Sequence, residues 1–188
     1  MKGCIARLDI NCFIGCLFAW LTIPAYAINL EFKGELVDRP CQIDSGSLNQ
    51  TVQFLERPVK DFQVSPGKGA TEKFSIRLVD CDTSSLWKTV KLKFSGVKEQ
   101  GMNENSDWFL SVTGDNKGKL AVGLLDTDGV TPLKLDTEHN NRQGTSIDKN
   151  TVILNFSAFV QATPEAIANK SVVPAEYTAT AFFDVLYE

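Results

Sequence analysis

Histidine is almost absent from the sequence: its 188 residues include one, His139, in a polar stretch. A serine-hydrolase triad needs a histidine base and a nucleophile motif, and no such motif surrounds His139. A zinc site would need several histidine or cysteine ligands. Residues 67–69 (Gly-Lys-Gly) neither follow a strand nor open a helix, as a phosphate loop would. The sequence therefore predicts neither an enzyme nor a cofactor, although two carboxylates that meet in space could still form a glycosidase pair.

Runs of positive charge are missing as well. Lysine and arginine number 19 against 23 acidic residues, and no basic run is interleaved with aromatic residues, so we expect no nucleic-acid partner. Residues 126–129 (Asp-Thr-Asp-Gly) hint at calcium, but they lack the further acidic ligands and the closing glutamate of a calcium loop. Asp-Gly between apolar runs predicts a hairpin turn instead, and no metal site is expected.

No apolar run reaches the roughly 20 residues that a membrane-spanning helix needs. The longest lies at residues 12–23. It follows Lys2 and Arg7 and precedes Ala25-Tyr26-Ala27, which has the form of a cleavage site, so residues 1–27 are predicted to be a secretory signal. A lipoprotein signal ending at Cys16 is disfavoured, because the apolar run continues beyond that cysteine.

Cysteine is scarce once the predicted signal is set aside. Three of the five cysteines fall within residues 1–27, which leaves Cys41 and Cys81. Two cysteines in an exported protein are expected to pair. Closing a loop of this length would contribute about 4 kcal/mol by the chain-entropy estimate. The alternative is two free, buried thiols.

Long amphipathic helices are also lacking, and only residues 165–168 suggest a helical turn. The chain instead alternates apolar and polar residues, which is typical of strands buried on one face. Short strands separated by turn signals indicate a single all-β sandwich domain. The predicted strands are residues 50–55, 73–79, 89–94, 108–112, 120–125, 131–135, 151–162 and 176–187.

Residues 28–36 alternate too, but no segment that could pair with them follows directly. One side of this predicted strand carries four apolar residues and a glycine: Ile28, Leu30, Phe32, Gly34 and Leu36. The pattern then breaks at residues 38–41 without the chemistry of a hairpin turn. The prediction is that this strand finds its partner on another molecule.

Taken in order, these pieces resemble a type 1-like fimbrial subunit, a pilin of the chaperone–usher pathway. The resemblance covers residues 28–188 and lies in the alternating tail, the cysteine spacing and a terminal strand with tyrosine next to last. It also includes the segments KLKFSG (residues 91–96), VGLLDTDG (122–129) and LNFSAFVQAT (154–163). One departure is that residues 173–177 lack the glycine that many members have before the last strand.

The resemblance implies an all-β fold, an incomplete immunoglobulin-like β-sandwich that lacks its last strand and is completed by a donor strand from another subunit. Residues 28–37 would be the donor extension and residues 38–188 the pilin domain. A periplasmic pilus chaperone would complete the sandwich first. At the outer-membrane usher, the tail of the next subunit would replace the chaperone strand.

The implied function is that of a structural subunit, shaft or minor adaptor, of an adhesive fimbrium on the surface of a Gram-negative bacterium. Its partners would be the chaperone, the usher and neighbouring fimbrial subunits. In the donor strand, burying Ile28, Leu30, Phe32 and Leu36 would gain roughly 6–12 kcal/mol before ordering costs, and Gly34 would allow close approach. The implied acceptor residues, with the chaperone binding the C-terminal end, are Ala179, Ala181, Phe183, Val185, Tyr187 and Glu188.

Three alternatives stay open. A fimbrial adhesin or lectin-type subunit would bind host glycan, with Trp87 and Trp108 as candidate sugar platforms, but the family's adhesins carry an extra receptor-binding domain and no donor tail. A self-contained secreted sandwich would pair residues 28–36 within its own chain. A terminator subunit would lack a groove that a donor strand could fill.

Overall fold

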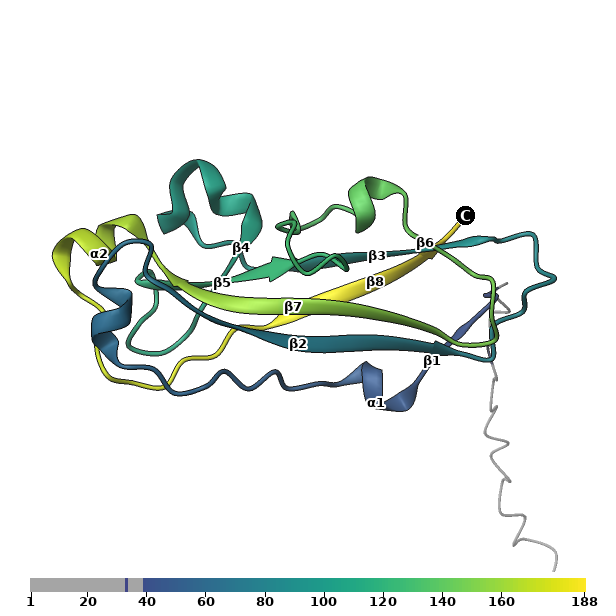
Figure 1. Ribbon diagram of the computed structural model, residues 1–188, viewed down its shortest axis with the longest axis horizontal. Coiled ribbons are helices and arrows are strands. Elements are labelled where there is room, and N and C mark those ends of the chain that lie inside the picture. Colours follow the sequence, from purple (N-terminus) through teal and green to yellow (C-terminus); the bar gives the residue numbers. More distant parts are fainter. Residues whose placement is uncertain (1–32, 34–38) are drawn as a thin grey trace, which may run out of the picture. The chain divides into compact units, whose positions relative to one another are not determined.

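The computed structural model describes Lys33 and residues 39–188 (Figure 1). The predicted signal and the predicted donor residues lie outside the described residues. Residues 39–188 form two antiparallel β-sheets joined by short helical segments. Within this described part, no helix is long and apolar enough to cross a membrane.

The larger sheet has five strands in the order β1-β2-β7-β5-β4. Its two longest strands, β2 and β7, pair in register from Phe74 opposite Phe156 to Leu78 opposite Val152. These residues carry the inward side chains, so the alternation of the sequence appears in the sheet as one core face and one outer face. The bounds are β1 Gln42–Ile43, β2 Lys68–Val79, β4 Phe109–Ser111, β5 Leu120–Leu125 and β7 Val152–Ala162.

The smaller sheet has the order β6-β3-β8, with bounds β3 Thr89–Gly96, β6 Thr145–Ser146 and β8 Ala181–Tyr187. The central strand, β3, is covered along both edges. β8 pairs with one edge, and β6 and residues 136–139 lie along the other, where the Asp136 amide donates to the Phe94 carbonyl at 2.7 Å. Among the described strands, β8 has β3 as its only neighbour.

Five short helical segments connect the strands: α1 Ser45–Leu48, η2 Val59–Phe62, η3 Gln100–Trp108, η4 Asn140–Arg142 and α2 Pro164–Asn169. α2 contains the helical turn predicted at residues 165–168. Its start follows from the sequence, because the Thr163 hydroxyl accepts a hydrogen bond from the Ala166 amide and Pro164 occupies the first turn.

The core lies between the two sheets and is centred on aromatic rings. Phe94 of β3 contacts Phe156 of β7 edge to face, with ring centroids 5.0 Å apart, and Phe74 of β2 lies 6.0 Å from Phe94. The predicted disulfide is present: Cys41 and Cys81 are bonded and both are buried. It ties the start of the described body to the end of β2.

Several strand predictions are wrong in detail. Residues 50–55 form no strand, because within the described chain no backbone hydrogen bond joins them to a neighbouring segment. Residues 131–135 form a hairpin return without becoming a strand. Trp108 ends η3 instead of opening a strand, and the last strand begins at Ala181 rather than at residue 176.

His139, which the sequence places in a polar loop, is fully buried. Its backbone amide donates to the Leu92 carbonyl, and the Leu92 amide donates to His139 Nδ1 at 2.9 Å. Because Nδ1 accepts, Nε2 carries the proton and faces the Thr145 hydroxyl at 3.0 Å. Burial lowers the pKa of His139 from its ordinary value of 6.5, with the Asp126 carboxylate opposing the shift and Lys91 adding to it.

We predict that neutral His139 makes the fold sensitive to mild acid. The unfolded chain takes up the proton near pH 6.5, before the folded chain does, so stability is complete above that pH and falls as the pH drops through the window below it. Urea unfolding between pH 7 and 5.5 should show a loss of up to about 1.4 kcal/mol per pH unit that His139→Gln abolishes. Equal slopes in the two proteins would contradict this assignment.

Candidate functional site: an incomplete edge at the last strand

The inward face of β8 is only half-buried, although it faces the same core as β3. Val185 lies opposite Leu92 and Phe183 opposite Phe94 in the β3–β8 register. Leu92 is 0% exposed and Phe94 3%, whereas Phe183, Val185 and Tyr187 are all partly exposed while packing against the core. Two adjacent strands with the same inward pattern therefore differ in burial, because within the described chain β3 has neighbours on both sides and β8 on one.

The second edge of β8 has no partner strand in the described chain. Residues 50–57 also belong to no sheet of the described chain. They run along the body from α1 to η2 (Figure 1). Phe54 of this segment contacts Tyr177, just before β8, with ring centroids 6.4 Å apart. Like Phe183 and Val185, both residues are partly buried hydrophobics packed on the main core.

We call this half-buried face the β8 strip and define it by Tyr177, Ala179, Phe183, Val185 and Tyr187. Of the predicted acceptor residues, the structure brings four into the strip. Ala181 lies at the first position of β8 and is exposed, and Ala179 precedes the strand. Tyr177 was missed as a site residue, although its place at period two before Ala179 could have suggested it.

The C-terminal end of β8 is fixed by polar contacts. The Tyr187 hydroxyl donates to the Cys41 carbonyl at 3.2 Å, which links the last strand to the disulfide. Glu188 pairs with Lys91 at 2.6 Å, and the amides of Lys88 and Thr89 both donate to its carbonyl oxygen at 2.7 Å. Burial raises the pKa of the Tyr187 phenol, so this hydroxyl stays protonated as a donor.

The outer face of β8 differs from the strip. Phe182 is 67% exposed, and Asp184 pairs with Lys93 across the strands at 3.4 Å. Lys91 and Lys93 are thus engaged with acidic partners along the outer face of the smaller sheet.

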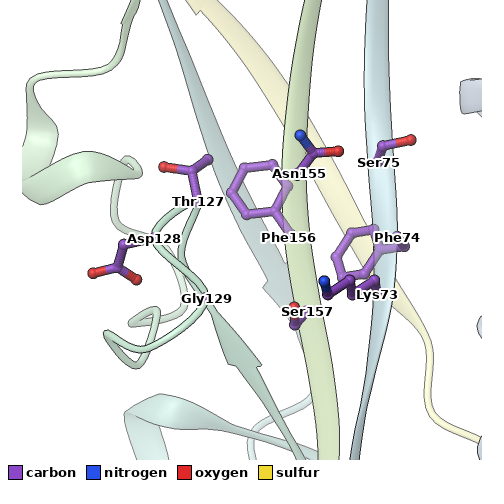
Figure 2. A pocket seen from close by; sticks show the side chains of 9 residues that line it. All are labelled: Lys73, Phe74, Ser75, Thr127, Asp128, Gly129, Asn155, Phe156 and Ser157. Atoms are coloured by element: carbon purple, nitrogen blue, oxygen red, sulfur yellow. The ribbon is translucent and has the colours of Figure 1, made fainter.

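A separate hollow of about 540 Å³ lies on the outer face of the larger sheet (Figure 2). Side chains of β2 and β7, among them Lys73 and Asn155, line it together with residues 127–129. The Asp128 carboxylate accepts hydrogen bonds from the Thr131 hydroxyl and from the amides of Val130 and Thr131. These bonds lower the pKa of Asp128 and hold the turn. No His, Cys, Asp or Glu cluster suited to a metal occurs in the described chain. Neither Trp87 nor Trp108 lines the hollow.

Comparison with known proteins decides the family. Residues 30–188 match the family model of fimbrial protein. The chain belongs to the fimbrial protein family. It is 45% identical over 172 residues to the fimbrial adapter PapK of Escherichia coli, covering 91% of this chain and 94% of that protein. It is 32% identical over 165 residues to the major MR/P fimbria protein of Proteus mirabilis, covering 85% and 83%.

Solved structures agree on the fold. A chaperone–usher pilus structure superposes with a TM-score of 0.66 at 23% identity, over 89% of this chain and 99% of that chain. The fold of this fimbrial subunit is therefore the immunoglobulin-like sandwich that lacks a strand, as the family resemblance implied. The protein is a structural subunit of a surface fimbrium of Gram-negative bacteria and assembles with neighbouring fimbrial subunits.

The two faces of β8 offer a matched test of the strip. Phe183→Ala removes a ring that packs on Phe94 with centroids 6.2 Å apart, so we expect it to lower the free energy of unfolding by roughly 1–3 kcal/mol, less than a fully buried phenylalanine would. Phe182→Ala removes an exposed ring and should change it by less than about 0.5 kcal/mol. Urea unfolding of both variants measures this, and equal losses would contradict the assignment of the two faces.

Proposed function

We propose that this subunit polymerises by strand addition at the β8 strip. The observation that carries the proposal is the contrast between Leu92 and Val185, register partners of which one is fully buried and the other is not. A strand added along the free edge of β8 would pair with its unused backbone groups. Its inward side chains would complete the burial of Phe183, Val185 and Tyr187.

Residues 28–36 are the proposed donor strand for a neighbouring subunit. Their apolar side carries Leu30 and Phe32, the kind of side chains that a half-buried apolar strip takes up. A periplasmic chaperone is proposed to occupy the strip of this subunit before polymerisation, and its basic residues to bind near Tyr187 and Glu188. Export through the periplasm would follow from the predicted signal at residues 1–27, and exchange of strands would take place at the outer-membrane usher.

Within the fimbrium we propose an adaptor role. The identity to the adapter PapK, 45%, exceeds that to the major MR/P fimbria protein, 32%, over alignments of similar length. A subunit of this kind joins two different neighbours, one that receives its tail and one whose tail it accepts. It would therefore occur in few copies in each fimbrium.

Quantitative mass spectrometry of purified fimbriae tests both parts. We expect far fewer copies of this chain than of the shaft subunit. The double variant Leu30→Ser/Phe32→Ser should lose incorporation, because its tail can no longer fill a neighbour's strip. The matched variant Asn29→Ser/Glu31→Ser, altered on the polar side of the tail, should be incorporated like the natural chain.

Two results would count against the proposal. Normal incorporation of Leu30→Ser/Phe32→Ser would contradict the donor role of the tail. Recovery of this chain as the most abundant fimbrial protein would contradict the adaptor role and leave that of a shaft subunit.

A further inference from the structure

The loop between β2 and β3 exposes two consecutive apolar residues, Leu86 and Trp87. Leu86 is 94% exposed, the highest value among the large exposed hydrophobic side chains of the described residues, and Trp87 is 38% exposed. Single exposed leucines are common on protein surfaces and need no explanation. The place of this pair in the subunit is what makes it informative.

The loop is held in a defined shape by its own polar groups. Asp82 Oδ1 accepts hydrogen bonds from the Ser84 amide at 2.8 Å and the Ser84 hydroxyl at 2.6 Å. The Lys88 ammonium donates to the Thr83 carbonyl at 2.7 Å. Leu86 is thus presented on a braced loop, which lowers the entropy cost of burying it against a partner.

This loop lies beside the point where the chain enters the body. The Asp82 amide donates to the Pro40 carbonyl at 2.7 Å. The neighbouring residues in the sequence, Cys81 and Cys41, are joined by the disulfide. Figure 1 shows the loop before β3 at the same end of the body as β1. Leu86 and Trp87 therefore belong to the end from which the predicted donor tail departs.

The length of the connection restricts what can face this end. The predicted donor strand ends at Leu36, and Arg39 follows three residues later, so their Cα atoms are at most about 11 Å apart. Wherever Leu36 is buried in a neighbouring subunit, the end of the body that carries Arg39 and Pro40 must lie against that same neighbour.

We propose that Leu86 and Trp87 form a second contact with the subunit that receives this chain's tail. This inference rests on the proposed donor function and goes beyond it, because it assigns a body-to-body interface in addition to the strand in the groove. The partner is an apolar patch of the receiving fimbrial subunit, next to the site where the tail enters. The contact would fix the angle between the two bodies, which the short connection alone leaves free.

Site-specific photo-cross-linking in assembled fimbriae tests the interface. The full chain is produced with p-benzoylphenylalanine replacing one of three residues: Leu86 in the loop, Glu31 on the polar side of the tail, or Val130 as the control. Val130 is 78% exposed and lies in the turn after β5. After irradiation, mass spectrometry identifies the subunit joined to each position.

The expected result is that positions 86 and 31 cross-link to the same fimbrial subunit and that position 130 gives no such product. Three results would overturn the interface while leaving the donor function intact. Position 31 could cross-link while position 86 gives no product, position 86 could cross-link to a different subunit from position 31, or positions 86 and 130 could give equal yields. Absence of subunit products at both 31 and 86 would overturn the donor function, and the interface with it.

Discussion

The structure depends on a sandwich edge that its described chain does not close. β3 and β8 present the same alternating apolar pattern to one core, yet Leu92 is fully buried and its partner Val185 is not. An unpaired edge beside half-exposed core side chains is unfavourable for a solitary protein, because it invites aggregation. Under the proposed function, the same feature is the binding site for a neighbour's strand, and the free energy of closing it is available for polymerisation. Subunit stability and fimbrial assembly are then two measures of one interaction.

Contacts near the two ends of β8 hold this strand in place before a donor strand is added. At one end, Tyr187 reaches the Cys41 carbonyl, so the end of β8 is fixed to the disulfide that joins β1 to β2. Phe54 of the segment 50–57 contacts Tyr177 just before β8, and this segment pairs with no strand of the described chain. A donor strand would meet a β8 whose C-terminal end is already held by these contacts, which reduces the entropy lost when the strand is added.

The sequence predicted the parts of the fold that depend on local pattern. It failed where the structure of a segment depends on contacts with other parts of the chain. Alternation located β3 and β7, and export together with cysteine count predicted the disulfide. Residues 50–55 also alternate, but a strand needs a backbone neighbour, and the described chain supplies none. His139 gave no signal of burial, since the Leu92 backbone that pairs with it belongs to β3, 47 residues away in the sequence. The half-exposure of the β8 strip was expected only through the family resemblance, because periodicity shows which face is apolar and not whether that face is covered.

The central claim is that the inward face of β8 is open in the folded subunit. The most direct measurement compares thiol labelling of Val185→Cys and Leu92→Cys under native conditions, since these residues are register partners on the same inward side. We predict that Val185→Cys reacts with a thiol reagent, that the reaction stops when the pilus chaperone is bound, and that Leu92→Cys stays protected throughout. Equal protection of both thiols in the isolated, folded subunit would show a closed sandwich and contradict the account.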